Sequence, residues 1–571
     1  MDEDLRERIR EAGEASALYN ALKHDSDAQV GAILGPLMAD NPAFREHGDA
    51  IPGILGPVVE EVNAMDAGEQ RERLTEIAPD RLAELEADEE GEDQVLPDLP
   101  NVEDYEEVRM RLAPNPNGPW HLGSARMPSV IGTYKDIYDG WMCCRFDDTD
   151  PETKRPDLDA YDAILDAIDY LGFEPDEVVR ASDRLETYYD HARDLIDLGG
   201  AYTCSCAQED FSDLKNVGEA CGHRDKDKSL TREEFEAMVD GEYDPGDMVL
   251  RVKTDIEHPN PALRDWVAFR MIDTPHPRPE AADYRCWPML DFQSGIDDHL
   301  TGITHIVRGI DLQDSAKRQR FVYDYFDWAY PELVHWGHVQ VDAYDVQMST
   351  STIRERIESG DLDGWDDPRA PTLASLRRRG IRGDAIVDAM VELGTSTSNV
   401  DLSMSAVYAH NRERIDDETD RAFFVRDPVE KQIVGGPETG TPPVHPDHED
   451  RGVREIYVTD GVALEPEDVP ARSERVWLKG YGCVRHIRDA FEYTGDGIDV
   501  VREGGVDVVQ WVPAADSLSV RMRTMEGDVE GRAEPGLATY ESGAMLQFER
   551  VGFVRVDRHD PAETVVYYAH P

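Results

Sequence analysis

The middle of the chain shows a strand, a loop, a helix and a second strand in succession. Residues 108–113 (VRMRLA) and 141–148 (WMCCRFDD) are short apolar runs, and the segment that ends at Tyr138 has the apolar spacing of a helix. Two buried strands joined by a helix form a βαβ unit with parallel strands. Ligands of such sheets bind outside the carboxyl ends of the strands, so we expect the loop after residue 113 to line a site.

The pattern differs on either side of this unit. Residues 1–82 have helical apolar spacing broken by Gly and Pro, and residues 83–100 (AELEADEEGEDQVLPDLP) are acidic and bounded by proline, which predicts a solvated linker. Residues 352–415 are rich in helical segments. From residue 423 onward, short apolar runs alternate with turn residues, which is typical of an all-β barrel or a sandwich pair.

Length and charge narrow the class of protein. The 571 residues are enough for roughly three to five domains, and 9 Trp, 22 Tyr and 14 Phe indicate a folded chain. Asp and Glu number 121 against 59 Lys and Arg, a net charge of −62, and only 10 of the basic residues are lysines. This composition suits a cytoplasm at near-molar salt, where screening weakens repulsion between carboxylates. We therefore expect a halophilic protein, and its charge does not exclude an RNA partner.

The apolar runs and the cysteines of the chain indicate its location and the state of its thiols. No run of about 18 apolar residues occurs and the N-terminal segment is acidic, so we expect no membrane span, no signal peptide and a cytoplasmic protein. Seven cysteines in such a chain favour thiols or metal ligands over disulfides. Cys143 and Cys144 are neighbours on a strand and therefore point to opposite faces, and we expect Cys286 and Cys483 in the core.

Four of the potential ligands are spaced as metal ligands are. The pairs Cys204-x-Cys206 and Cys221-x-His223 form a set of the type that binds structural Zn²⁺, with buried or idle thiols as the alternative.

The loop after the first strand has the composition of an anion site. Residues 111–126 read RLAPNPNGPWHLGSAR, in which Gly123 allows a nucleotide to approach the backbone and His121 adds a polar side chain. Because proline is tolerated only in the first turn of a helix, Pro128 places the helix start near Ser124.

This block resembles the HIGH motif of the class I aminoacyl-tRNA synthetases, here His121-Leu122-Gly123-Ser124, and the Arg-x-Ala-Pro before it is similar to the glutamyl/glutaminyl branch. Other blocks carry the resemblance from about residue 105 to residue 571: RFDDTDP (145–151), DDHLTGITHIVRGIDL (297–312), SLRRRGI (375–381) and NRERIDDETDRAFFV (411–425). A β-barrel C-terminus is similar to the archaeal and eukaryotic type.

The resemblance implies a multidomain α/β fold and the part that each segment plays. The implied parts are a helical N-terminal appendage with an acidic linker (1–100), the first half of a catalytic domain with a Rossmann-like parallel sheet (101–200), an inserted acceptor-arm domain (201–285), the second half of the catalytic domain (286–351), a helical connector (352–422) and a β-barrel anticodon-binding region (423–571).

The resemblance also implies a reaction and its residues. The reaction is ATP-dependent attachment of glutamate to tRNA(Glu) through glutamyl-adenylate, with Mg²⁺ bridging phosphates and release of AMP and pyrophosphate. The residues expected to be catalytic are His121, Gly123, Ser124, Met348, Ser349, Ser351 and Arg354. Those expected to bind ATP are Pro116, Gly118, His121, Gly123 and Ser349, and those expected to bind glutamate are Arg111, Asn115, Asp147 and Arg308.

Arg308 carries the choice of amino acid. The resemblance places it where glutamyl enzymes have arginine and glutaminyl enzymes a small neutral residue. Glutamate and glutamine have nearly the same shape, and a buried guanidinium pairs with a γ-carboxylate but is left unpaired opposite an amide. A surface arginine in a salt bridge is the structural alternative. A glutaminyl-tRNA synthetase, and a non-catalytic RNA-binding relative of these enzymes, remain the alternative functions.

Two segments depart from the family pattern. Pro288-Met289-Leu290 stands where most relatives have Pro-Thr-Tyr, so a tyrosine contact to substrate is absent or supplied elsewhere. Residues 347–351 (QMSTS) match the KMSKS loop but lack both of its lysines. Thr352 to Glu355 has the pattern of a capping box that would start a helix, and we expect Arg354 or the helix N-terminus to take over part of the phosphate contact.

RNA contacts are the last expectation. Residues 377–379 are three successive arginines, which fit either tRNA binding or a solvated helix face, and Trp477, Tyr481 and Trp511 fit either base stacking or a barrel core. Whether tRNA(Gln) is also charged, and whether the chain contacts a tRNA-dependent amidotransferase, stay open.

Overall fold

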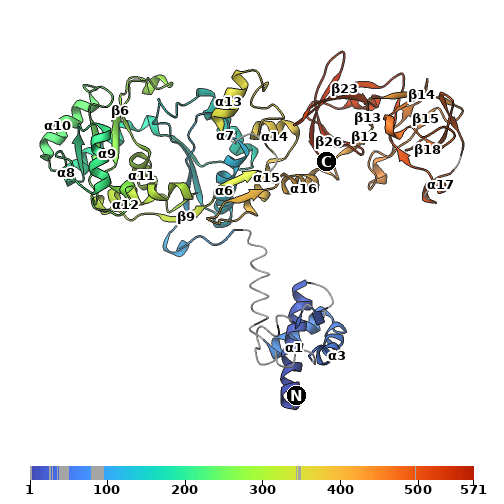
Figure 1. Ribbon diagram of the computed structural model, residues 1–571, viewed down its shortest axis with the longest axis horizontal. Coiled ribbons are helices and arrows are strands. Elements are labelled where there is room, and N and C mark those ends of the chain that lie inside the picture. Colours follow the sequence, from blue (N-terminus) through green and yellow to red (C-terminus); the bar gives the residue numbers. More distant parts are fainter. Residues whose placement is uncertain are drawn as a thin grey trace. The chain divides into compact units, whose positions relative to one another are not determined.

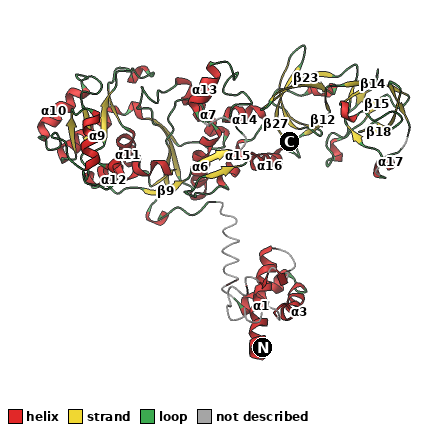
Figure 2. Cartoon of the chain, viewed as in Figure 1, coloured by secondary structure: helices red, strands yellow, loops and turns green. Residues whose placement is uncertain are grey.

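A computed structural model describes residues 3–24, 28, 30–31, 33–34, 37, 51–78, 81, 96–341, 344, 349–495, 497–503 and 505–571. The chain divides into two compact units, Met1–Pro97 and Asp98–Pro571 (Figure 1). Figure 2 shows that helices dominate the first unit and that the strands lie in the second. No helix in the described part of the chain is long and apolar enough to cross a membrane.

The first unit is helical, as its apolar spacing predicts. Its helices are α1 (Glu3–His24), α3 (Ile51–Asn63) and α4 (Ala67–Ile77). They enclose an apolar core in which Leu18, Leu55 and Val62 have no exposed surface. The predicted acidic linker lies largely outside the described residues, which resume at residue 96.

The second unit begins with the predicted βαβ arrangement. The strands β1 (Arg109–Leu112), β2 (Trp141–Phe146) and β3 (Glu177–Arg180) form a parallel sheet in that order, and α6 (Arg126–Tyr138) joins the first two. A parallel pair, β8 (His305–Gly309) and β9 (Glu332–Trp336), lies beside β1, because Thr304 and Arg109 exchange hydrogen bonds. The carboxyl ends of β1, β2 and β8 therefore face one region.

Four helices accompany these strands: α7 (Leu158–Tyr170), α8 (Leu185–Leu198), α11 (Leu290–Leu300) and α12 (Gln313–Phe326). Eight residues of α11 in a row, from Asp291 to Asp298, are buried. A helix buried on all sides that still carries carboxylates needs cationic partners, and these lie in the site described below.

A four-stranded antiparallel sheet interrupts the parallel arrangement in the segment where we expect an insertion. Its order is β4 (Ala201–Cys204), β5 (Val249–Val252), β6 (Val267–Met271) and β7 (Cys286–Pro288), with α9 (Gln208–Val217) and α10 (Lys228–Val239) between β4 and β5. This sheet shares a core with α8, since Tyr189 packs on Phe269 and bonds the Cys286 carbonyl. Cys286 and Cys483 are buried, as predicted.

Helices link this region to the C-terminal strands. They are α13 (Thr350–Glu358), α14 (Leu373–Arg379), α15 (Gly383–Val391) and α16 (Met404–Ile415), and the short strands β10 (Val339–Val341) and β11 (Val400–Leu402) pair in parallel among them. The capping-box prediction is wrong. The helix α13 begins at Thr350, with Ser349 preceding it in an extended conformation, so Thr352 already lies inside the helix.

The C-terminal third is all β, as predicted, and forms two seven-stranded sheets with separate cores. One sheet has the order β12 (Asp420–Ala422), β25 (Met545–Phe548), β26 (Gly552–His559), β27 (Thr564–His570), β23 (Leu518–Thr524), β24 (Gly527–Ala533) and β13 (Phe424–Arg426). The other has β21 (Val508–Val509), β18 (Arg475–Leu478), β19 (Gly482–Ile487), β20 (Ala490–Tyr493), β14 (Val429–Val434), β17 (Val462–Leu464) and β22 (Val512–Pro513).

The structure bears on both pairs of alternatives that the sequence left open for RNA contacts. Trp511 has no exposed surface and Tyr481 is 7% exposed, so both are core residues, and only Trp477 of the predicted trio is partly exposed. Arg379 is buried and bonds the carbonyls of Tyr568 and Ala569. Arg378, which pairs with Asp557, and Arg379 therefore join α14 to the barrel, while Arg377 is half exposed and pairs with Asp166 of α7.

Candidate active site

The loop between β1 and α6 is tied to the end of β2. The Asn115 amide donates to the Asp147 carbonyl (2.9 Å), and the Asp147 backbone N–H donates to the Pro114 carbonyl (2.9 Å). A 3-10 turn (Leu122–Ala125) precedes α6, which starts at Arg126, two residues later than predicted. Pro128 is the third residue of α6 and so lies in its first turn, where proline is tolerated.

A cavity of about 490 Å³ lies where β1, β2 and β8 end. Its lining includes all four residues that we expect to bind glutamate, namely Arg111, Asn115, Asp147 and Arg308. Tertiary folding therefore brings together side chains separated by nearly 200 positions. Met289 and Leu290 also line this cavity, which agrees with their apolar assignment.

An ion-pair network forms the floor of this cavity. Arg111 Nε lies 3.0 Å from Asp298 Oδ1, and Arg145 Nη1 lies 2.6 Å from the same oxygen. Burial alone would raise the pKa of the Asp298 carboxyl, but the two guanidiniums hold that pKa below its ordinary value. Asp298 therefore stays ionised and fixes both arginines.

Asp147 offers a carboxylate to the cavity. Its Oδ1 accepts from Arg145 Nε (2.8 Å) and from the fully buried Gln293 amide (2.9 Å). Its Oδ2 accepts no hydrogen bond from any residue that the structure describes. An acceptor of this kind, held rigidly at a cavity wall, suits an ammonium group.

Arg308 is the exception among the buried arginines of the cavity. Its side chain is 6% exposed, Nη2 donates to Gln319 Oε1 (3.2 Å) and to the Tyr330 hydroxyl (3.3 Å), and Nε has no partner among the described residues. Unlike Arg111 and Arg145, it forms no ion pair with a described carboxylate. Burial lowers the pKa of its guanidinium, because a buried cation without an anionic partner is disfavoured. The surface salt-bridge alternative is thereby excluded.

A second cavity, of about 530 Å³, lies on the other side of the loop. Its lining includes Gly118, His121, Gly123, Ser124 and Thr350. The Ser124 hydroxyl lies 3.4 Å from the His121 ring, and burial lowers the pKa of that imidazole, so His121 is neutral near neutral pH and can donate one hydrogen bond. Pro116 lies in the same loop and accepts from the Asp157 backbone N–H through its carbonyl.

The start of α13 closes on this loop. A Cβ at Gly118 would lie 2.3 Å from Thr350 Cγ2, so only glycine fits there. Arg354 Nη2 donates to the Asn117 carbonyl and to Asp157 Oδ2, both at 2.8 Å. Arg354, which we expected to contact phosphate, therefore bonds the loop and Asp157 in this structure, and it is not among the residues that line the second cavity.

The signature segment is described only in part. Met348, which we expected to be catalytic, and Gln347 lie outside the described residues. The Ser349 and Ser351 hydroxyls lie 2.8 Å apart at the N-terminus of α13. Both are thus placed beside Thr350, which lines the second cavity.

Sequence analysis missed several residues of the site. Arg145 and Asp298 lie inside the family blocks, yet no role was assigned to them, although charged residues within a buried strand and helix are a signal in themselves. Arg126, 2% exposed, lines the second cavity and leaves Nε and Nη1 without a described partner. Gln319 and Tyr330 carried no pattern that marks a site.

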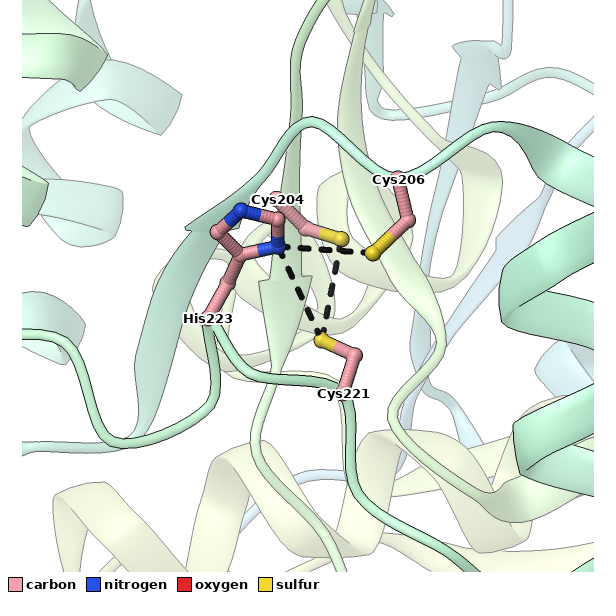
Figure 3. Close-up of side chains that lie close together, drawn as sticks. All are labelled: Cys204, Cys206, Cys221 and His223. Atoms are coloured by element: carbon pink, nitrogen blue, oxygen red, sulfur yellow. Dashed lines mark hydrogen bonds between the residues drawn. The ribbon is translucent and has the colours of Figure 1, made fainter.

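The four predicted metal ligands do come together. Figure 3 shows Cys204, Cys206, Cys221 and His223 converging from the end of β4 and from the loop between α9 and α10, and their ligand atoms all lie within 4.8 Å of one another. Cys204 Sγ lies 3.8 Å from Cys221 Sγ, and Cys206 Sγ lies 3.4 Å from His223 Nδ1. Zn–S bonds of about 2.3 Å in a tetrahedron give edges of about 3.8 Å, so the cluster fits this ion.

The second unit thus has a parallel sheet whose strand ends meet two polar cavities, followed by a helical connector and two β-sheets, an arrangement that places ligands at the strand ends but does not by itself fix the function. Family models identify the class of protein. Residues 107–417 match "tRNA synthetases class I (E and Q), catalytic domain", and residues 419–500 and 508–557 match two anticodon-binding domain families of the same group.

Full-length relatives are more specific. The chain is 70% identical to "Glutamate--tRNA ligase" of Haloarcula marismortui and 71% identical to that of Natronomonas pharaonis, each with 100% of both chains covered. It is 42% identical to that of Methanosarcina acetivorans over 98% of both chains. The chain belongs to the glutamate–tRNA ligase family. The first two organisms fit the halophilic origin that the composition predicts.

Proposed function

We propose that this chain attaches glutamate to tRNA(Glu) in two steps, through glutamyl-adenylate, using ATP and Mg²⁺ and releasing AMP and pyrophosphate. The names of the full-length relatives support the amino acid. The observation that carries the proposal is Arg308, a buried cation without a carboxylate partner in a cavity whose other buried arginines are already paired.

The amino-acid cavity would hold glutamate at both ends. Asp147 Oδ2 and the side-chain oxygen Oδ1 of Asn115, which has no partner among the described residues, are acceptors for the α-ammonium. Arg308 pairs with the γ-carboxylate, and Arg111, fixed by Asp298, sets the positive potential of the wall behind the substrate. A buried guanidinium gains a charge-assisted bond from a carboxylate and none from an amide, so glutamine is rejected.

The second cavity would take the nucleotide. Gly118 and Gly123 leave the backbone accessible, Pro116 shapes the loop between them, and neutral His121 with Ser124 donates hydrogen bonds to phosphate oxygens. Mg²⁺, when bound, neutralises phosphate charge. The α-carboxylate of glutamate then attacks the α-phosphate in line, and the site contributes mainly position and electrostatic stabilisation.

Arg354 would act as a positioning residue on this side. Its bonds to the Asn117 carbonyl and to Asp157 fix the loop against α13. Arg354 follows the segment 347–351, in which relatives carry lysines that neutralise phosphate charge. The proposal keeps the catalytic role expected for three residues of the preceding segment, namely Met348, Ser349 and Ser351.

The cytoplasmic location and the tRNA contacts belong to this proposal. The two C-terminal sheets would bind the anticodon, as the descriptions of the two matching families indicate, and partly exposed Trp477 is the remaining candidate for stacking. Charging of tRNA(Gln) and contact with a tRNA-dependent amidotransferase are extensions that this proposal allows, and the charging assay below decides the first.

Aminoacylation tests the proposed function. The purified chain in molar KCl is given unfractionated tRNA, ATP, Mg²⁺ and either labelled glutamate or labelled glutamine. Stable charging with glutamate alone is the expected result, and sequencing of the charged tRNA shows whether tRNA(Gln) is included. Charging with glutamine, or with neither amino acid, would contradict the proposal.

We also propose that the Cys/His cluster binds structural Zn²⁺. Elemental analysis of the native protein should find about one zinc per chain, and a Cys204→Ser, Cys221→Ser double variant should lose it together with thermal stability, because structural zinc contributes folding energy. The matched control is Cys286→Ala, which removes a buried thiol outside the cluster and should keep its zinc. Zinc-free native protein with full stability would contradict the assignment.

A further inference from the structure

Behind Arg308 lies a group of neutral polar side chains that no family motif includes. Gln319, on α12, has no exposed surface, and both its amide oxygen and its amide nitrogen form hydrogen bonds. The oxygen Oε1 accepts from Arg308 Nη2 (3.2 Å) and from the Tyr330 hydroxyl (2.6 Å), while Nε2 donates to the Ser294 hydroxyl (2.7 Å). These residues come from α11, β8, α12 and the segment before β9.

The chemistry of the partners fixes the direction of the amide. A guanidinium has only donors, so it must face the amide oxygen, and the amide nitrogen must then face the serine. The side chain is also held sterically, because a Cβ at Gly295 would lie 3.3 Å from Gln319 Cγ. Gln319 therefore holds Arg308 from behind in one orientation.

The charge of this support is as important as its position. A glutamate at 319 would have the same shape and could form an ion pair with Arg308, just as Asp298 does with Arg111. Such a partner would consume the charge that the cavity otherwise offers to a ligand. The neutral amide orients the guanidinium without forming an ion pair, so the positive charge remains available to a ligand.

We propose that Gln319, together with Tyr330, is a specificity-determining positioning residue: it orients Arg308 through neutral acceptors so that the γ-carboxylate of the substrate is the first anion the guanidinium meets. This inference rests on the proposed function, because it takes glutamate as the ligand of Arg308. Most relatives have a tyrosine at the position of Leu290. In this chain Tyr330, which bonds Arg308, is a tyrosine from another segment that acts on the same site.

The decisive variant is Gln319→Glu, which changes one charge and hardly any volume. The assay is aminoacylation of tRNA, from which the KM for glutamate and the inhibition constant of L-glutamine are both obtained. We expect the KM for glutamate to rise about 100-fold, because the new carboxylate competes for Arg308. The glutamine inhibition constant should change by less than about 3-fold, since an amide gains nothing from that charge.

Two further variants separate charge from structure. Gln319→Met removes the amide without adding charge, so it should raise the KM for glutamate by about 10-fold while keeping most of the preference for glutamate over glutamine. Gln313→Glu makes the same charge change at an exposed position of the same helix and should leave both constants unchanged. Thermal unfolding confirms that each variant is folded.

Every outcome decides the proposal. A Gln319→Glu enzyme with an unchanged KM for glutamate, or with both constants raised by the same factor, overturns the role of Gln319 while the proposed function stands. A native enzyme that neither charges nor binds glutamate overturns both.

Discussion

The two cavities on either side of the β1 loop differ in how they handle charge. Among the buried arginines of the proposed amino-acid cavity, Arg111 and Arg145 pair with Asp298 or Asp147, whereas Arg308 forms no ion pair with a described carboxylate. In the second cavity the polar groups include a neutral imidazole, a hydroxyl, glycine backbone and Arg126, whose Nη2 donates to the Gly394 carbonyl and whose Nε and Nη1 have no partner among the described residues. The proposed function assigns one carboxylate of defined position to the first cavity and a ligand with many oxygens of its own to the second.

This difference suggests that the first cavity determines selectivity for the amino acid and that the second determines the rate of turnover. Distinguishing two isosteric amino acids needs a fixed, desolvated charge, and in the first cavity the neutral acceptors Gln319 and Tyr330 hold Arg308 beside a network of ion pairs. Neutralising a polyphosphate needs donors that can adapt as charge moves. We therefore expect substitutions on the first side to act on selectivity and stability, and those on the second to act on turnover.

The largest effect should come from removing the free charge. Arg308→Ala should lower kcat/KM for glutamate by about 10³-fold to 10⁴-fold, because the γ-carboxylate then lacks its partner, while the KM for ATP stays close to that of the native enzyme. Steady-state aminoacylation with both substrates varied provides the measurement. If the KM for ATP rose by the same factor as kcat/KM for glutamate fell, the two cavities would not have separate roles.

Next in size is the anion that organises the floor of the cavity. Asp298→Asn leaves Arg111 and Arg145 partly unpaired and should reduce the free energy of unfolding by about 3 to 5 kcal/mol, measured by denaturant titration. The control is Asp166→Asn, which breaks an exposed pair with Arg377 and should cost less than about 1 kcal/mol.

The pH dependence of that difference has a definite sign. The folded-state pKa of Asp298 lies below its ordinary value, so its ionised form stabilises the fold at every pH above the unfolded-state pKa. The stability gap between native protein and Asp298→Asn should be constant above about pH 5 and should narrow as the pH falls below about 4. A gap that widens in acid would show that the carboxyl is protonated in the native state.

The smallest effect should come from the second cavity. Arg354→Ala releases the Asn117 carbonyl and Asp157 and should lower the rate of pyrophosphate exchange by about 10-fold to 100-fold, with little change in the KM for glutamate. Arg356→Ala, on the same helix and paired with Asp361, is the matched control. Native rates of exchange in Arg354→Ala would remove its role.

Local patterns predicted much of the fold. The alternation of strand and helix between residues 108 and 146, the helical first unit, the β-rich C-terminal third and the grouping of Cys204 with His223 follow from spacing that neighbouring residues impose on one another. The start of α13 was misplaced because the capping pattern competed with tertiary contacts, notably Thr350 packed on Gly118.

What the sequence determined by itself is the identity of the family, the surroundings of the protein and the residues of its motifs, including Arg308. Only the tertiary structure decided which of these charges are free. Arg111, Arg145 and Arg308 look alike along the chain. Their difference depends on Asp298, more than 150 positions from the two arginines it pairs with, and on Gln319, which lies on the helix after β8. Charge compensation is a property of distances in space, and those distances exist only after folding.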